Sequence, residues 1–347
     1  MSFNPLKKIA YKLVKYIINS QFFRREIWYA LKDILYSCPH DSRLRYVSDP
    51  YFSKVIATRT DETKTGRPIF ITGRFRSGST FLWSVFRNVP GLTAYYEPLN
   101  ENRWFLDRRF SVDPTHVGVD DYSREYKGLH YLDKYFDRDW TYKKLYMGAR
   151  DYDRNLFGYI SELVGAAKGR PVLQFNRIDF RLPWIRANFE NVLIINIVRN
   201  PREQWMSVLR DGGDISPNFV IKHLDGPGLF YTLAWAQDLK TIFPFLEPIG
   251  QHPYKIHYYL WRLSYIFAQI YGDYTVRYEE LISKFKVVAK TLLDFLGIAS
   301  DSDLLIKLAS LNKGSEKERW PSYATSEWFE SIEAECERVL RAYFADV

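Results

Sequence analysis

The sequence predicts an α/β fold in three layers, with a central, mostly parallel sheet and helical insertions. Three observations support this. A short apolar run at 69–71 is followed by a Gly/Ser/Arg-rich loop and then by apolar residues at helical spacing. The run 192–198 is mostly β-branched, as in a strand buried on both faces. A helix opens directly behind that run, with Pro201 at or near its first position. Alternating strands and helices are typical of parallel sheets.

The remaining elements follow from apolar runs, helical periodicity and the positions of Gly and Pro. We expect strands at 69–71, 92–97, 171–177, 191–200 and 273–278, and helices at 80–89, through 184–189, from 201 onward, and at 229–243, 254–271, 279–296 and 325–344. The Gly/Pro-rich segment 210–227 is long enough to be a lid over a site.

The expected domain organisation is an N-terminal helical extension at 1–67 and a main domain at 68–347 with a substrate-side insertion at about 99–170. In the extension, residues 3–36 have apolar positions at helical spacing with lysines between them. Such a stretch can lie peripherally on an anionic membrane surface. It can also pack on the main domain with a solvated basic face, which is the interpretation we favour.

Composition limits the classes of function. The chain has 347 residues, of which 46% are hydrophobic and 26% charged, so it can bury a core. Its net charge of +8 favours an anionic partner, such as a nucleotide, an acidic glycan, nucleic acid or a lipid headgroup. Two cysteines far apart argue against a disulfide framework or a structural zinc site and fit a reducing compartment. We therefore expect a cytoplasmic protein, with peripheral membrane contact as the open alternative.

The loop at 73–79 is the first candidate for a binding site. It holds two Gly, two Ser and two Arg between a strand and a helix, where backbone N–H groups and a helix N-terminus suit an anionic oxygen cluster. Its place is that of a phosphate-binding P-loop, so the predicted fold is P-loop-like. The Gly-Lys step of a P-loop is missing, however, and Arg76 precedes Ser-Gly-Ser-Thr instead. An ordinary turn that needs Gly is the alternative.

Two further positions lie at the carboxyl ends of predicted strands, where open α/β sheets bind their ligands. Arg199 ends one strand, and Ser207 follows eight residues later on a helix, so both can reach one phosphate. A buried salt bridge is the alternative for Arg199. Glu97 ends another strand before Pro98 and is either in the same crevice or an ordinary surface carboxylate.

These segments together resemble the sulfotransferases that use 3′-phosphoadenosine 5′-phosphosulfate (PAPS). The run GRFRSGST at 73–80 is similar to their 5′-phosphosulfate loop, and VRNPREQWMS at 198–207 is similar to their 3′-phosphate site. The run VRYEEL at 276–281, followed by FLG at 295–297, matches a third pattern of the family. The resemblance covers roughly 68–300 and is closer to the carbohydrate, tyrosylprotein and bacterial branches than to the cytosolic phenol and steroid enzymes.

The resemblance implies a role for each matching residue. Residues 76–80 cradle the 5′-phosphosulfate, Arg199 and Ser207 bind the 3′-phosphate, and Phe81 and Tyr278 lie at the adenine. The implied cofactor-binding set is Arg74, Phe75, Arg76, Ser77, Gly78, Ser79, Thr80, Phe81, Arg199, Ser207, Tyr278, Lys313 and Gly314. The implied catalytic set is Glu97, Arg76 and Arg177, and no metal is expected.

The function implied is transfer of the sulfuryl group from PAPS to a hydroxyl acceptor. Glu97 is the general base, and Arg76 stabilises the leaving phosphate. The catalytic Lys that many members carry has no counterpart at 171–177, where Arg177 is the candidate for its charge. If Glu97 is not the base, His223 in the segment 210–227 is the next candidate.

The acceptor is expected to be a carbohydrate or glycolipid, because the insertion is rich in Tyr, Trp and Arg. A tyrosyl or small-alcohol acceptor stays open, and no nucleic-acid partner is expected. Two other classes of function are alternatives. A P-loop nucleotide kinase or NTPase requires the missing Gly-Lys-Ser/Thr step and a magnesium-binding Asp. The other is a non-catalytic basic protein that binds glycans or membrane surfaces.

Overall fold

The structure is a computed structural model. It describes residues 43–51, 66–106, 108, 111–113, 116, 119–212, 215–224, 229–312, 314 and 318–345. Most of the expected N-terminal extension, 1–67, lies outside these ranges, and so does the whole basic stretch 3–36. The extension therefore stays a prediction.

A five-stranded sheet forms the centre of the molecule, and all its strand pairs are parallel. The strands, in the order β2-β3-β1-β4-β5 across the sheet, are β2 (Leu92–Tyr96), β3 (Arg170–Gln174), β1 (Ile69–Thr72), β4 (Leu193–Val198) and β5 (Tyr274–Arg277). Every residue of β1 and β4 is buried, as their apolar sequences predict. The predicted α/β class with a parallel sheet is confirmed.

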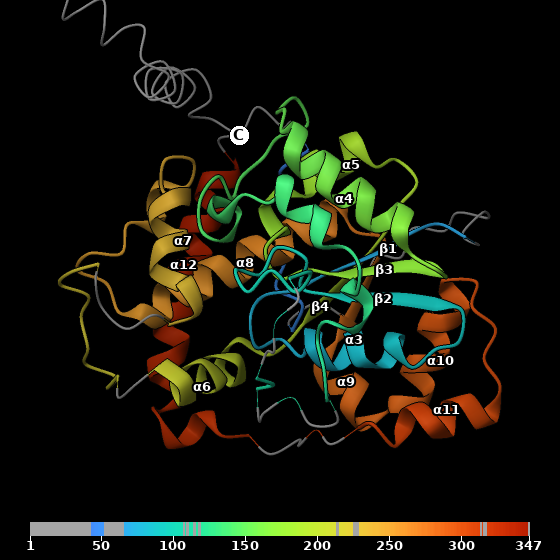
Figure 1. The fold of residues 1–347 in the computed structure, drawn as a ribbon. Coiled ribbons are helices and arrows are strands. Elements are labelled where there is room, and N and C mark those ends of the chain that lie inside the picture. Colours follow the sequence, from blue (N-terminus) through green and yellow to red (C-terminus); the bar gives the residue numbers. More distant parts are fainter. Residues whose placement is uncertain are drawn as a thin grey trace, which may run out of the picture.

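Helices cover both faces of the sheet (Figure 1), so the predicted three layers and the P-loop-like architecture are confirmed. In Figure 1, α4, α5 and α8 lie on one face, and α3, α9 and α10 lie on the other. The helices are α3 (Ser79–Arg87), α4 (Arg154–Ala166), α5 (Leu182–Asn188), α6 (Pro201–Gly212), α7 (Thr232–Leu239), α8 (Pro253–Tyr271), α9 (Tyr278–Ser283), α10 (Phe285–Phe295), α11 (Ser302–Ala309) and α12 (Ser326–Ala345).

The helices differ from the sequence-based expectation in several places. Helix α4 was not among those expected, and in the helix expected at 229–243 only α7, Thr232–Leu239, is α-helical. The helix expected at 279–296 is interrupted at Lys284, whose φ of −124° and ψ of 40° are not helical. Just before this break, the carbonyl of Ile282 accepts a hydrogen bond from Nδ2 of Asn312. Helix α11 was not anticipated. Its one local signal is Asp301, which caps it by accepting a hydrogen bond from the N–H of Leu304.

Where the structure describes it, the segment between β2 and β3 contains short 3₁₀ turns and one α-helix, α4. Its 3₁₀ turns include 124–126, 130–134 and 138–141. Six of its aromatic side chains are buried in the core, and four more are half-buried against it: Trp104, Phe105, Tyr122, Tyr126, Trp140 and Tyr159, and then Tyr135, Phe136, Tyr142 and Tyr146. The segment is thus largely a packed cover on the sheet, which limits how many of its rings can face a ligand.

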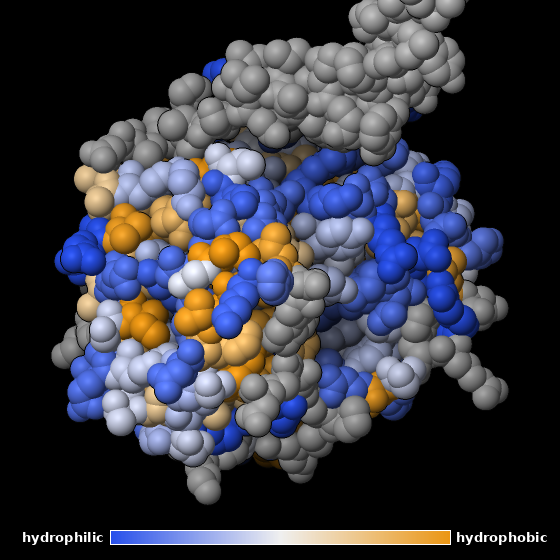
Figure 2. All heavy atoms as spheres, turned by 90° about the vertical axis from the view of Figure 1, so that its left-hand side faces the viewer, coloured by the Kyte–Doolittle hydropathy of each residue, from blue (hydrophilic) through white to orange (hydrophobic). Residues whose placement is uncertain are grey.

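Figure 2 turns toward the viewer the side of the molecule on which Figure 1 shows α6, α7 and α12. Hydrophilic residues cover most of this face, with smaller hydrophobic groups between them. None of the helices in the described part of the chain is long and apolar enough to cross a membrane.

The strand order places the site. From β1 the chain first adds β2 and β3 on one side and then β4 and β5 on the other. The connections therefore change direction at the carboxyl end of β1, and such a switch point is where open α/β sheets bind ligands. The pairing of Thr72 with Asn196 brings the carboxyl ends of β1 and β4 to the same edge. The loops that follow these two strands are thus neighbours.

Candidate active site

The loop 73–78 joins β1 to α3 and leaves the first turn of that helix open. Gly78, the residue before α3, has a φ of 92°, and among the described residues no side chain caps the helix. A Cβ on Gly78 would lie 2.3 Å from Cδ2 of Tyr278, so only glycine lets this ring lie against the loop. An uncapped helix N-terminus presents unpaired N–H groups and the positive end of the helix dipole. The loop therefore has the chemistry of an anion site.

Arg76 joins this loop to the helix that follows β4. Its Nε donates a 2.9 Å hydrogen bond to Oγ of Ser207 on α6. Its carbonyl oxygen accepts a 3.2 Å hydrogen bond from Nη1 of Arg199, the residue directly after β4. Arg76 has a φ of 66°, a left-handed conformation that costs free energy in a non-glycine residue. The structure thus brings Arg76, Arg199 and Ser207 together around one point.

Arg199 is positioned by stacking as much as by hydrogen bonds. Its guanidinium carbon lies 4.6 Å from the centroid of the Tyr278 ring, and Nη2 is 3.9 Å from a carboxylate oxygen of Glu203. Burial lowers the pKa of Arg199. Its Nε is buried without a hydrogen-bond partner among the described residues. A buried donor of this kind suits an anionic ligand that accepts from it.

Arg74 lies behind the loop, and its side chain belongs to the interior. The guanidinium is 4.2 Å from the centroid of the Trp235 ring and 3.8 Å from a carboxylate oxygen of Asp179. Asp179 also accepts hydrogen bonds from Thr72 at 2.7 Å and Ser264 at 2.9 Å. Burial lowers the pKa of Arg74 to about 10, which leaves it charged at neutral pH. If Arg74 contacts a ligand in the loop, its backbone makes that contact, because its side chain is in the interior.

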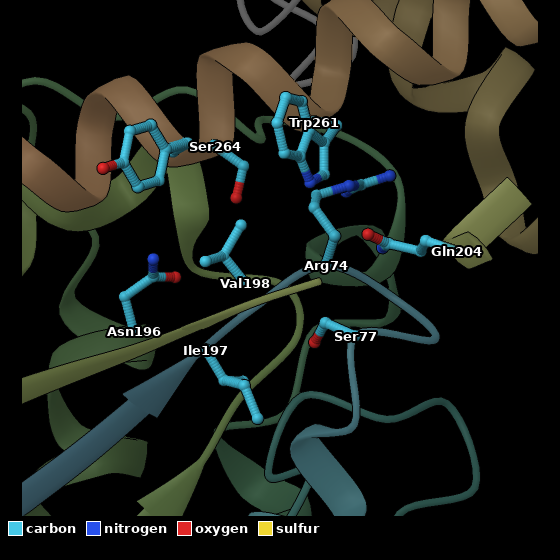
Figure 3. Close-up of a pocket in the computed structure, with 9 residues that line it drawn as sticks. Arg74, Ser77, Asn196, Ile197, Val198, Gln204, Trp261 and Ser264 are labelled. Atoms are coloured by element: carbon cyan, nitrogen blue, oxygen red, sulfur yellow. The ribbon is translucent and has the colours of Figure 1, made fainter. Parts of the chain in front are cut away.

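A small cavity separates the back of the loop from β4 and α6 (Figure 3). Arg74, Ser77, Asn196 and Gln204 line it, and each has a buried polar atom without a hydrogen-bond partner among the described residues. The atoms are two N–H donors, one carbonyl acceptor and one hydroxyl, and the space holds about one water molecule. A water with four such partners would tie the back of the loop to the sheet.

Glu97 lies directly after β2 in a dense hydrogen-bond network. Its Oε1 accepts from Nδ2 of Asn176 at 2.6 Å, and its Oε2 accepts from Nδ2 of Asn100 at 2.6 Å and from Nη1 of Arg177 at 3.0 Å. The residue is buried, and its φ of 36° is in the left-handed region. The network fixes the orientation of the carboxylate. Burial raises the pKa of the neighbouring Tyr96, and the Glu97 carboxylate, with which its hydroxyl also interacts, raises it further.

Arg177 links this network to the loop. Its Nη2 donates to Glu101 at 2.8 Å, and its guanidinium carbon is 5.0 Å from the ring centroid of Phe75 in the loop. Tyr231 donates a 2.6 Å hydrogen bond to the same Glu101. Glu97 and the loop are thus neighbours, with the guanidinium of Arg177 and the ring of Phe75 between them.

A strained segment packs on the loop beside this network. Leu229, Phe230 and Tyr231 have φ values of 37°, 49° and 62°, three consecutive non-glycine residues in the left-handed region. The ring centroid of Phe230 is 5.9 Å from that of Phe75, and the guanidinium carbon of Arg76 is 5.5 Å from the Phe230 ring. Backbone strain of this kind is common at functional sites, where the surrounding structure maintains it.

Two residues of the site, Asp113 and His116, were missed by sequence reasoning. Nε2 of His116 is 3.4 Å from Oγ1 of Thr80 in the first turn of α3. Oδ2 of Asp113 is 3.7 Å from Nη1 of Arg76. His116 has no partner at metal-ligand spacing in the sequence, and it lies 36 positions from Thr80, so no local pattern signals the contact.

The other predicted site residues are more scattered. Phe81 is half-buried on α3, and its ring centroid is 5.9 Å from that of Phe285. Gly314 lies so close to Ile282 that a Cβ would be 2.3 Å from its Cδ1. Lys313 lies outside the described residues, and His223 is exposed. Within the described ranges, no group of three or more His, Cys, Asp or Glu gathers as metal ligands would.

Comparison with known proteins gives one family. The model of the sulfotransferase family matches residues 68–303, which run from the start of β1 to the start of α11 and include every strand of the sheet. None of the curated proteins matches this chain.

Solved structures of sulfotransferases are also similar to it. Mouse sulfotransferase SULT7A1, complexed with PAP, is 15% identical with a TM-score of 0.39, and the match covers 81% of this chain and 90% of that one. Sulfotransferase STF9 from Mycobacterium avium is 14% identical with a TM-score of 0.42, covering 78% and 75%. A sulfotransferase from Alicyclobacillus acidocaldarius is 17% identical with a TM-score of 0.39, covering 80% and 96%.

Proposed function

The chain belongs to the sulfotransferase family, and from this premise we propose that it transfers the sulfuryl group of PAPS to a hydroxyl acceptor. The observation that carries the proposal is the meeting of two anion-binding loops, through the hydrogen bonds that Arg76 makes with Ser207 and Arg199. PAPS has anionic groups at both its 5′ and its 3′ positions, so it needs two such loops at once. Family membership sets aside the nucleotide kinase and the non-catalytic binder.

The residues present fit PAPS. The uncapped N-terminus of α3 and the backbone of 76–80 are available to the 5′-phosphosulfate. Arg199, with its unpaired buried Nε, and Ser207 are available to the 3′-phosphate. Tyr278, on which the Arg199 guanidinium stacks, and Phe81 are assigned to the adenine. Gly314, with Lys313 outside the described residues, completes the proposed 3′-phosphate site.

The chemistry follows from these positions. Bound PAPS supplies a sulfuryl group on a phosphate that is already ionised, and by analogy with phosphoryl transfer the transition state is loose and in line. Arg76 and the loop N–H groups stabilise the charge that grows on the leaving oxygen, without reorganising. Glu97 takes the proton of the acceptor hydroxyl. Arg177 orients Glu97 and supplies the positive charge that a Lys supplies in many members.

A carbohydrate or glycolipid is the proposed acceptor. Six aromatic rings of the insertion are buried in the core, so the support comes from a smaller group. The half-buried rings of Tyr142 and Tyr231 stack with centroids 6.4 Å apart and planes at 14°, and Tyr231 contacts Glu101 beside the Glu97 network. Flat aromatic faces suit the apolar faces of sugars, and carboxylates suit their hydroxyls. A cytoplasmic location, with peripheral membrane contact through residues 3–36, belongs to the same proposal.

The test is a transfer assay with sulfur-labelled PAPS and four separate acceptor pools: oligosaccharides, glycolipids, tyrosyl peptides and small alcohols. We expect label in the oligosaccharide or glycolipid pool with the wild-type protein, and ~10²–10³-fold slower labelling with Arg76→Ala. Label only in the peptide or alcohol pool would show that the proposed acceptor is wrong and the proposed reaction is right. Label in no pool, from a protein that also fails to bind PAPS, would overturn the proposed function.

A further inference from the structure

Asp113 holds an unusual position at the mouth of the loop. Its Oδ2 lies between two nitrogen atoms, 3.7 Å from Nη1 of Arg76 and 3.9 Å from Nε2 of His116. Arg76 directs its Nε to Ser207, so the outer part of its guanidinium is what faces Asp113. The Asp113 carboxylate thus lies beside the nitrogens of Arg76 and His116 at the start of α3. This is the position at which a helix N-terminus binds an anion.

The tautomer of His116 is assigned here from its contact with Tyr122. Oη of Tyr122 accepts a 3.0 Å hydrogen bond from the backbone N–H of Asp113 and is in close hydrogen-bond contact with Nδ1 of His116. We assign the single proton of the Tyr122 hydroxyl to this contact, so that Nδ1 is the acceptor. In a neutral imidazole whose Nδ1 accepts, Nε2 carries the proton. His116 therefore presents an N–H donor, and not a base, toward Thr80 and Asp113.

On the premise of the proposed function, we propose that Asp113 holds the place of a non-bridging oxygen of the phosphosulfate. When PAPS binds, Arg76 and the Nε2–H of His116 exchange their contact with Asp113 for a hydrogen bond to that oxygen. Carboxylate and phosphosulfate oxygens accept the same charge-assisted hydrogen bonds, so one can replace the other at these donors. His116 thereby becomes a residue that binds the co-substrate, and Asp113 becomes its intramolecular competitor.

The contacts of Asp113 suit a competitor that gives way. Both distances exceed those of a hydrogen bond, so these two pairings are loose. The Asp113 side chain is 37% exposed, against 10% for Arg76 and 17% for His116. At these distances the two ion pairs themselves contribute little free energy, so an acceptor that bonds the same donors directly can replace them. The two donors, in contrast, are fixed by Ser207 and Tyr122, so they stay in place when their acceptor changes.

Three variants test the inference, with PAPS binding measured by calorimetry in the absence of acceptor. Asp113→Asn removes the competing charge and should tighten PAPS binding by about three- to tenfold. His116→Asn keeps a polar group near Nδ1 but removes the Nε2–H, and should weaken binding by about tenfold or more. His116→Gln places an amide nitrogen near Nε2 and should restore most of that loss. Thermal unfolding of each variant shows whether it is folded.

Each contrary result has a distinct meaning. Unchanged PAPS affinity in Asp113→Asn would overturn the place assigned to Asp113. If His116 is a general base, both Asn and Gln variants should lose kcat by ~10²–10⁴ with PAPS affinity unchanged, which would overturn the donor role. Equal affinity of the Asn and Gln variants and the wild type would also overturn it. The wild type serves as the control for the premise, because its failure to bind PAPS would count against the proposed function itself.

Discussion

The Nε of Arg76 donates a 2.9 Å hydrogen bond to Oγ of Ser207, a residue 131 positions further along the chain. The bond joins the loop after β1 to the helix after β4, the two segments that the sequence singles out as anion sites. Because Nε is held by Ser207, the terminal nitrogens of the guanidinium keep one orientation. The pair thus makes the two loops parts of one site.

Arg76→Ala should lower the rate of sulfuryl transfer by ~10²–10³, since it removes a donor to the leaving oxygen. Arg76→Lys is the matched variant: it keeps the charge but cannot bond Ser207 and a ligand with one planar group, so it should recover only part of the rate. Ser207→Ala should have a smaller effect than either. Steady-state kinetics on folded variants measure all three, and unchanged turnover in Arg76→Ala would remove the residue from the site.

Arg199→Ala should weaken the binding of adenosine 3′,5′-bisphosphate by about 2–5 kcal/mol, because a bound phosphate loses its charged partner. The loss should nearly vanish for adenosine 5′-phosphate, which has no 3′-phosphate. Calorimetric titration of the wild type and the variant with both nucleotides gives the comparison. Equal losses for the two nucleotides would place Arg199 away from the 3′-phosphate.

Glu97→Gln should lower kcat by ~10²–10⁴ if Glu97 takes the acceptor proton, while PAPS affinity barely changes. The fold should persist, because Arg177 keeps its 2.8 Å bond to Glu101 and Gln can still accept from Asn176. Steady-state kinetics and a melting curve separate the possible roles. A lower melting temperature with the wild-type rate per folded molecule would make Glu97 a structural carboxylate, and a raised KM with unchanged kcat would make it an acceptor-binding group.

The buried ring of His257 predicts a pH dependence of stability. Burial lowers its pKa from 6.5 to about 3, and its Nε2 lies 3.2 Å from the carbonyl oxygen of Pro201. Below pH 6.5, His257 is protonated in the unfolded chain but stays neutral in the folded chain. The free energy of unfolding therefore falls as pH falls from 6.5 toward 3. Between pH 7 and pH 5 the loss from this residue should be about 2 kcal/mol.

Urea denaturation at pH 7, 6 and 5 measures this effect, with His257→Gln as the control. The Gln amide can donate to Pro201 but does not titrate, so its stability should fall by about 2 kcal/mol less over the same range. The pKa of His252 is also lowered by burial and contributes in the same direction to both proteins. Identical pH dependence in the two proteins would show that His257 titrates normally.

The parts of the fold that the sequence predicts well are those with a local cause. The strand 193–198 is a run of apolar, mostly β-branched residues, and α6 begins at Pro201, as expected. The break at Lys284 and the helix at 302–309 were missed. The break coincides with a hydrogen bond from Asn312 to Ile282, 30 positions away, and the helix buries only Leu308. Contacts between distant residues leave little mark on a short stretch of sequence.

The site divides in the same way. Gly78, Arg76 and Arg199 could be anticipated because their spacing within a strand-loop-helix unit has a direct chemical reason. The interior role of Arg74 could not, since it depends on Asp179 and Trp235, more than a hundred positions further along the chain. The same holds for Asp113 and His116, whose place beside the loop follows from the path of an irregular segment. A sequence pattern predicts which groups can bind an anion, whereas only the fold shows what competes with it.

The most direct test of the two-loop site is a calorimetric comparison of adenosine 3′,5′-bisphosphate with adenosine 5′-phosphate on the wild-type protein, with and without magnesium. We expect the bisphosphate to bind about a hundredfold or more tightly, because only it reaches Arg199 and Ser207 while its 5′-phosphate lies in the loop at 73–80. Magnesium should change neither affinity. Equal affinities for the two nucleotides would contradict the joint site. Tighter binding of magnesium-ATP than of the bisphosphate would indicate a loop of the nucleotide-kinase type.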